Sequence, residues 1–123
     1  MTNVHQILNE REEKYGDFRE QARLSQSLKW VMHDGVNWHN MTPYMQESLE
    51  MIQHKIARIL NGDETYEDSW ADIVGYAQLA LDRLKSDNEG RALVKAFAEG
   101  KVSGSDMTVD KTFGEWATEF NSK

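Results

Sequence analysis

Apolar residues recur every three or four positions along most of this chain, a pattern typical of amphipathic helices. The sequence has no sustained alternation of β-branched and polar residues that would indicate strands. Glycine, asparagine and the single proline interrupt the helical pattern and separate its segments. The predicted helices cover residues 3–14, 17–33, 43–60 and 65–85. Four helices with short connections indicate an all-α fold with a four-helix bundle core.

Each predicted helix has one apolar stripe, and we expect these stripes to form the core. The stripes comprise Val4, Ile7 and Leu8; Phe18, Ala22, Leu28, Val31 and Met32; Met45, Leu49, Ile52, Ile56 and Ile59; and Trp70, Ile73, Ala77, Ala80, Leu81 and Leu84. Trp30 is expected in the core as well. In the helix predicted over residues 43–60, Thr42 is expected to be the N-cap and Pro43 the first helical residue.

The last third of the chain has a weaker pattern. Residues 1–85 are predicted to form the core domain, and residues 86–123 a short helical extension that packs on the core or on a partner subunit. Within the extension, residues 89–99 predict a short helix. Residues 112–121, with Phe113, Trp116 and Phe120, predict a final amphipathic segment.

Composition narrows the class of protein. The chain has 123 residues and no cysteine, so disulfides and thiolate metal sites are excluded. No apolar run approaches the ~20 residues of a membrane span, and the N-terminus does not resemble a signal peptide. We therefore expect a cytoplasmic protein. A net charge of −7 argues against stable nucleic-acid binding, because phosphate contacts require a basic surface.

Two of the predicted helices each carry a pair of acids. Glu47 and Glu50 are three residues apart, and Asp68 and Asp72 are four apart, so each pair lies on one helical face. If the two helices lie side by side, four carboxylates converge, and they repel one another unless a cation binds between them. Carboxylate oxygens suit Mg²⁺, and also Mn²⁺, better than zinc.

A plainer interpretation stays open, because acids opposite an apolar stripe usually form a solvated face. Asp68 has a further alternative, since its spacing from Thr65 fits a capping box. Against the solvated-face interpretation, Met51, Tyr76 and Leu79 lie toward the acidic sides. A second layer of helices or a partner subunit would explain these apolar positions.

Basic and aromatic residues near the acids suggest a phosphate ligand. Lys55 and Arg58 follow Glu50 on the same helix, where they could bind phosphate groups. Intrahelical pairing around His54 is an equal alternative. Tyr15 and Tyr76 could contact a base or sugar. The chain has no glycine-rich phosphate loop and no H-E-x-x-H zinc motif.

These motifs resemble those of the MazG-like all-α nucleoside triphosphate pyrophosphohydrolases, whose four-helix core has a Glu-Glu-x-x-Glu helix and a Glu-x-x-Asp helix. The chain is more similar to a small phage and bacterial branch of that superfamily, and the resemblance covers roughly residues 5–85. The shared pattern is Tyr15-Gly16, then Lys55-x-x-Arg58, then Asp68-Ser69-Trp70-x-Asp72-Ile73-x-Gly75-Tyr76-Ala77. The chain departs from the superfamily pattern at Gln46 and at Ser69, where acids are expected.

The resemblance implies a Mg²⁺-dependent hydrolase that cleaves a nucleoside triphosphate to a monophosphate and pyrophosphate. It implies that Glu47, Glu50, Asp68 and Asp72 bind the metal, that Glu47 and Glu50 are catalytic, and that Glu47 is a candidate base. It further implies phosphate contacts from Lys55 and Arg58, base or sugar contacts from Tyr15 and Tyr76, and assembly as a homodimer or homotetramer.

The reduced set of acids leaves a second hypothesis open. A phage-type bundle of this size could have kept the fold without turnover, and could bind a nucleotide or inhibit a host protein. A structural subunit without ion dependence is a third hypothesis.

Overall fold

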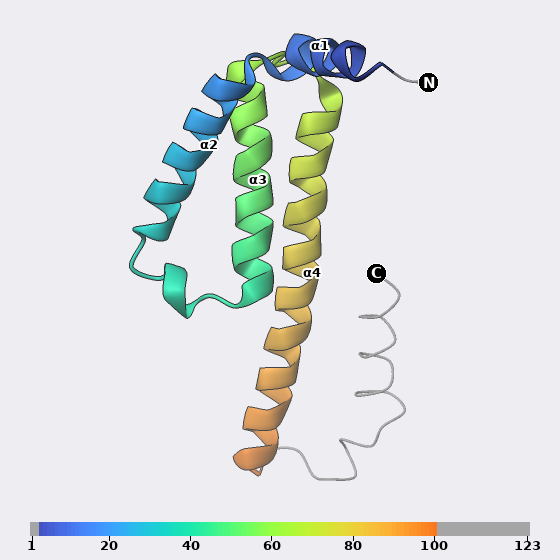
Figure 1. Cartoon of the computed structure of the whole chain (residues 1–123). Coiled ribbons are helices and arrows are strands. Elements are labelled where there is room, and N and C mark those ends of the chain that lie inside the picture. Colours follow the sequence, from blue (N-terminus) through green and yellow to red (C-terminus); the bar gives the residue numbers. More distant parts are fainter. Residues whose placement is uncertain (1–2, 101–123) are drawn as a thin grey trace. The chain divides into compact units, whose positions relative to one another are not determined.

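The computed structural model of the chain describes residues 3–100, all of whose regular elements are helical (Figure 1). The elements are α1 (Val4–Tyr15), α2 (Phe18–His33), the short 3₁₀ helix η1 (Trp38–Asn40), α3 (Pro43–Asn61) and α4 (Glu67–Ala98). The prediction of an all-α fold with four helices is confirmed. The amphipathic segment predicted at residues 112–121 lies outside the described residues.

The chain divides into two compact units, Met1–Gln78 and Leu79–Lys123. The boundary between them lies within α4. The predicted boundary between the core domain and the extension lay after residue 85. The first unit contains α1, α2, η1, α3 and the first part of α4, so it holds every residue predicted to act in binding or catalysis.

The helix starts follow local sequence signals. The carboxylate of Asp17 caps α2 by accepting a hydrogen bond from the backbone N–H of Glu20, at 3.3 Å. Thr42 occupies the predicted N-cap position of α3, and Pro43 is the first helical residue, although the Thr42 side chain makes no capping hydrogen bond.

The start of α4 differs from the prediction. Its first residue is Glu67, and the Thr65 hydroxyl donates to the Asp63 carboxylate at 2.6 Å instead of capping the helix. This hydrogen bond lowers the pKa of Asp63. The capping box that was considered as an alternative role for Asp68 therefore does not form.

The end of α4 also corrects a prediction. The separate helix expected over residues 89–99 is the C-terminal part of α4, which continues to Ala98. The intervening segment has no proline, and Gly90 alone costs a helix only about 1 kcal/mol, which flanking alanine and leucine residues offset.

Two chain turns distant in sequence interlock in the first unit. The side-chain amide of Asn61 donates to the carbonyl oxygens of Tyr15 and Asp17, at 2.9 and 2.8 Å. The backbone N–H of Asp63 donates to the carbonyl of Lys14 at 2.7 Å. Gly16 has a φ of 80°, which favours glycine. These contacts hold the α1–α2 turn against the end of α3.

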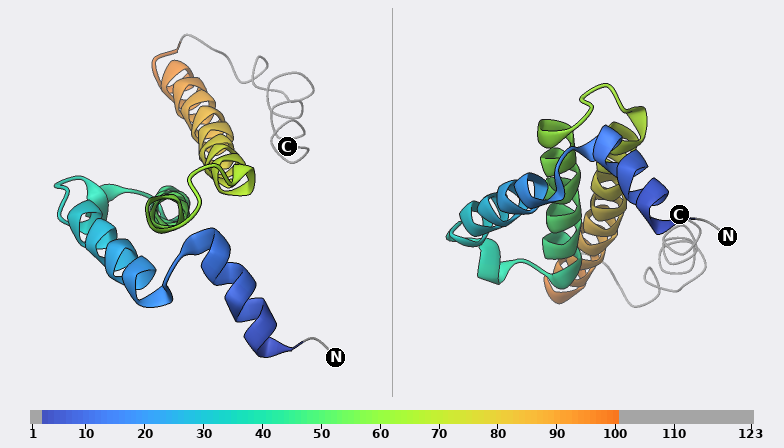
Figure 2. Two further views of the ribbon diagram at one scale, coloured as in Figure 1. Left: turned by 90° about the horizontal axis from the view of Figure 1, so that it is seen from above. Right: turned by 45° about the horizontal axis from the view of Figure 1, so that its top comes forward.

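The layer between α2 and α3 is unusually polar. The two helices contact each other and diverge toward η1 (Figures 1 and 2). Gln53 and Ser25 are buried between them, and the Gln53 amide donates to the Ser25 hydroxyl at 3.1 Å. Gln21 and Ala57 are buried too.

Tryptophan burial differs from the prediction. Trp30 and Trp70 were expected in the core, but their exposed fractions are 73% and 53% in the single chain. Trp38, in the segment expected to be a loop, is buried instead. Its ring lies 4.7 Å from the His33 ring, and its carbonyl accepts a hydrogen bond from the Gln46 side chain at 2.8 Å.

Many other apolar side chains are also exposed in the single chain, including several from the predicted stripes. Those in the first unit include Val4, Leu8, Phe18, Val31, Leu60 and Val74. Among residues 3–100, no helix combines the length and the apolar character that a membrane span requires.

The interlocked turns generate a stability prediction. A Cβ atom added at Gly16 would lie 2.0 Å from the Asn61 carbonyl oxygen, and one added at Gly62 would lie 2.1 Å from that of Lys14. We expect Gly16→Ala and Gly62→Ala each to lower the free energy of unfolding by at least about 2 kcal/mol in urea titrations.

Gly75→Ala is the matched control, because nothing lies within 4 Å of an added Cβ there. Inside α4 this change should raise the stability by about 0.5–1 kcal/mol. Equal effects at all three glycines would contradict the interlock.

Candidate functional site

A pocket of about 410 Å³ lies in the first unit, where α1, the start of α2 and α3 meet. Its lining combines cationic, aromatic, polar and apolar side chains. The lining residues are Leu8, Arg11, Glu12, Tyr15, Gly16, Asp17, Phe18, Gln21, His54 and Arg58. The interlocked turns form part of its wall, because Tyr15 and Gly16 belong to both.

Arg58 contributes a guanidinium group to this pocket. Its Cζ lies 4.1 Å from the centroid of the Tyr15 ring, which places the cation against the ring face. Its Nε is buried, and no hydrogen-bond partner for it exists in the described part of the chain. A buried donor without an acceptor is unfavourable by roughly 1–3 kcal/mol, so a bound acceptor would stabilise this arrangement.

Arg11 brings a second guanidinium to the same ring. Its Cζ lies 5.9 Å from the Tyr15 centroid. None of the ion pairs within residues 3–100 involves Arg11 or Arg58. Two like charges near one aromatic ring repel each other, and an anion between them would remove that repulsion.

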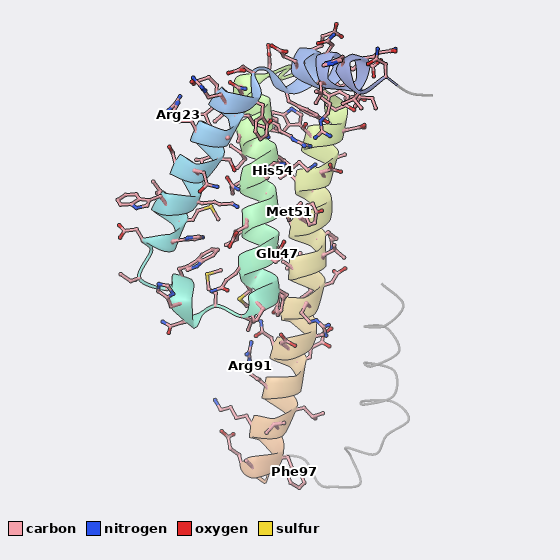
Figure 3. The ribbon with its side chains drawn as sticks, viewed as in Figure 1. Arg23, Glu47, Met51, His54, Arg91 and Phe97 are labelled. Atoms are coloured by element: carbon pink, nitrogen blue, oxygen red, sulfur yellow. The ribbon has the colours of Figure 1, made fainter. Side chains whose placement is uncertain are left out.

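His54 lies one helical turn before Arg58, on the stretch of α3 that is labelled in Figure 3. Burial lowers the pKa of the His54 imidazole, and the positive charges of Arg58, Lys55, Lys29 and Arg11 lower it further. The neutral imidazole is therefore the favoured form at pH 7. Four cations therefore act on the imidazole, two of them from the pocket lining, although the whole chain is acidic.

Two carboxylates also line the pocket. Asp17 is the N-cap of α2, so its negative charge interacts with the N-terminus of that helix. Glu12 follows Arg11 directly and is exposed. Neither lies at ion-pair distance from the pocket arginines in the described residues.

Tyr15 was expected to contact a base or sugar. In this structure its ring contacts the Arg58 guanidinium and meets the Tyr66 ring edge-on, with the two centroids 6.0 Å apart. Its immediate role is thus to hold Arg58. The second tyrosine expected at the base or sugar, Tyr76, is half-buried on α4 and does not line this pocket.

Lys55 and Arg58, which were predicted to bind phosphate together, have different surroundings. Arg58 lines the pocket, whereas the Lys55 ammonium forms an ion pair with Asp72 on α4, with 2.9 Å between Nζ and Oδ2. The Lys55 side chain is 13% exposed and that of Asp72 is 49% exposed.

The four acids of the predicted metal site have different surroundings. Glu50 faces α2, where its carboxylate lies 3.8 Å from Lys29 Nζ and 3.5 Å from His33 Nε2. Asp68 accepts a hydrogen bond from the Tyr66 hydroxyl at 2.9 Å, which raises the pKa of Tyr66. Glu47 is exposed on α3, more than a turn away from His54 (Figure 3).

Residues 3–100 contain no group of three or more histidine or acidic side chains arranged to hold a metal ion. In the single chain Glu50 and Asp72 pair with nearby cations. The assignment of Glu47, Glu50, Asp68 and Asp72 as metal ligands stays a prediction.

Arg11 was not predicted to be a site residue. His54 was considered only as a partner for neighbouring residues on its own helix. Arg11 had one usable signal, since it stands four residues before Tyr15 and therefore on the same helical face. Its meeting with Arg58 depends on how α1 packs against α3, which no local pattern specifies.

Comparison with known protein families places the chain in one of them. A family model that covers residues 1–83 matches it. The chain belongs to the DUF6378 family. That family is described as a domain of unknown function, and the matched residues include the whole pocket lining. No curated protein and no solved structure matches the chain significantly. The resemblance to MazG-like enzymes stays a prediction.

The Lys55–Asp72 ion pair can be measured with a double-mutant cycle of Lys55→Met and Asp72→Asn. Because Lys55 is mostly buried, we expect a coupling energy of about 0.5–1 kcal/mol in thermal or urea unfolding. The exposed pair Glu20–Arg23, with 3.0 Å between its charged atoms, should give about 0.3 kcal/mol or less. A coupling no larger than this control would contradict a structural role for the pair.

Proposed function

We propose that this protein binds a nucleotide, with the phosphate groups held in the pocket between Arg11 and Arg58. The observation that carries the proposal is Arg58, a residue of the pocket lining whose buried Nε lacks an acceptor in the described residues and which shares the pocket with a second arginine. Phosphate oxygens are the acceptors that arginine pairs with most favourably, because they match the geometry of its donors.

The remaining lining supports a nucleotide rather than a free inorganic anion. A volume of about 410 Å³ exceeds what one phosphate group requires and lies in the range of small-molecule sites. Leu8 and Phe18 add apolar surface, and Phe18 is 77% exposed, so its ring is accessible to a base. The net charge of −7 disfavours a long nucleic acid, whose many phosphates the acidic surface would repel.

A second candidate is the Mg²⁺-dependent nucleoside triphosphate pyrophosphohydrolase that the sequence resembles. Two observations favour it: Glu50 stands one helical turn from His54, and Asp72 binds Lys55, the residue after His54. Two of the four predicted carboxylates are thus close in sequence to His54 or paired with its neighbour Lys55, although neither lines the pocket. A metal, Mg²⁺ or Mn²⁺, would have to compete with Lys29, His33 and Lys55 for them.

Assembly with further copies of the chain belongs to the same proposal. Among the described residues only Trp38 and Ala57 are buried apolar side chains, which is a small core for the number of exposed apolar residues. Burial of such residues is the main source of folding free energy, so we infer a homodimer or homotetramer that covers them. A cytoplasmic location, in a host cell if a phage encodes the chain, is also part of this proposal.

Nucleotide binding is tested by calorimetry without a divalent metal. We expect Arg58→Gln and Arg11→Gln each to weaken binding of a nucleoside triphosphate by about 10- to 100-fold, since each removes a charged hydrogen-bond donor. Arg23→Gln is the control, because Arg23 is exposed on α2 and paired with Glu20 (Figure 3). Circular dichroism would confirm that each variant folds. Equal nucleotide affinity in all three variants would refute binding at this pocket.

Hydrolysis is tested by measuring pyrophosphate release from a panel of deoxy- and ribonucleotides with Mg²⁺ or Mn²⁺. If the second candidate is correct, the wild type releases pyrophosphate and Glu50→Gln or Asp72→Asn abolishes it, with the helical fold retained. Product formation that survives both changes would exclude this ligand set. Binding without product would favour a nucleotide-sequestering protein, and the absence of both would favour a protein partner such as an inhibited host protein.

A further inference from the structure

We propose that His54 takes up a proton when the pocket binds its anion, so that the site selects a doubly charged terminal phosphate over a singly charged phosphodiester. This inference rests on the proposed function and extends it to a class of ligand. The geometry behind it is that His54 lines the same pocket as Arg11 and Arg58, on the wall formed by α3.

The charged groups around His54 come from three helices and one turn. They are Arg11 and Glu12 on α1; Asp17 before α2; Lys29 on α2; and Glu50, Lys55 and Arg58 on α3. The carboxylate of Glu50 is occupied by Lys29 and His33, and that of Asp17 caps α2. All four cations lower the pKa of the imidazole. Lys29 is paired with Glu50, and Lys55 with Asp72. Within the described residues, the unpaired positive charge near His54 therefore comes mainly from Arg11 and Arg58.

In the free protein this environment disfavours a further positive charge, so His54 stays neutral at pH 7. A bound dianion reverses the balance, because it places two negative charges beside Arg11 and Arg58, the two cations that line the pocket with His54. The protonated imidazole can then donate a hydrogen bond to the anion from a ring nitrogen that was previously an acceptor. Binding of a dianion thus raises the pKa of His54.

Linkage fixes the direction of the pH dependence. If the anion raises the pKa of His54, protons must strengthen anion binding by the same factor. Affinity is independent of pH above the pKa of the complex. It rises as the pH falls between the two pKa values, by at most about tenfold per pH unit for one proton, and is constant again below the pKa of the free protein.

The same linkage distinguishes classes of phosphate. A terminal phosphate carries a second negative charge near neutral pH, whereas an internal phosphodiester carries only one. The singly charged group compensates the cationic pocket less and induces less protonation of His54. The preferred ligands are therefore terminal phosphates, such as those of free nucleotides, rather than the backbone of a nucleic acid.

Sulfate is the decisive probe, because it keeps two negative charges between pH 5.5 and 8, roughly the range in which histidine titrates. Methyl sulfate is the singly charged counterpart. The His54 imidazole resonances of the full chain would be followed by NMR with and without each anion. We expect sulfate to raise the His54 pKa clearly and methyl sulfate to raise it less.

Calorimetric titrations with sulfate provide the second readout. Wild-type affinity should rise several-fold from pH 8 to pH 5.5, with proton uptake visible as a dependence of the binding enthalpy on the buffer. His54→Gln should bind with an affinity independent of pH. His39→Gln is the control, because His39 is exposed on η1 and should leave the wild-type pH dependence intact.

The outcomes separate this inference from the proposed function. If sulfate binds and Arg58→Gln weakens it, but affinity and the His54 pKa do not change together, the inference is refuted and the binding site stands. If sulfate and nucleotides bind at no pH, both proposals fail. NMR on the wild type decides the question even if His54→Gln does not fold.

Discussion

The interlock between the α1–α2 turn and the end of α3 is the constraint on which the rest of the first unit depends. One amide, that of Asn61, satisfies the carbonyls of Tyr15 and Asp17, on either side of Gly16. Because Tyr15 is the last residue of α1, the same contact orients its ring toward Arg58. Loss of this interlock would therefore displace Tyr15 and Arg58 in the pocket, whereas each helix would keep its own backbone hydrogen bonds.

The pocket carries two arginines, whereas the chain as a whole has a net negative charge. A net charge of −7 disfavours the approach of a long polyanion, while a small pocket with two arginines is electrostatically suited to a compact anion. The ion pairs of Lys55 with Asp72 and of Lys29 with Glu50 hold two further cations close to His54 without closing the pocket. Acids that the sequence suggested as metal ligands thus position cations in the single chain.

Features with a local chemical cause could be predicted from the sequence, and features set by packing could not. The start of α2 follows from capping by Asp17, the start of α3 from Pro43 at the first helical position, and the all-α class from the apolar period. The burial of Trp38 in place of Trp30 depends on where η1 packs. Arg11 reaches the pocket only because α1 packs beside α3, which has no signature in either helix alone.

The hydrogen bond between Gln53 and Ser25 adds little to stability but restricts how α2 and α3 can align. If α3 slid by one turn, both side chains would be buried without partners, at roughly 1–3 kcal/mol each, whereas aliphatic residues would tolerate the shift. Gln53 directly precedes His54 on α3. This buried hydrogen bond thus fixes the position of His54 and Arg58 along α3 relative to α2, and it favours one alignment of the two helices over the others.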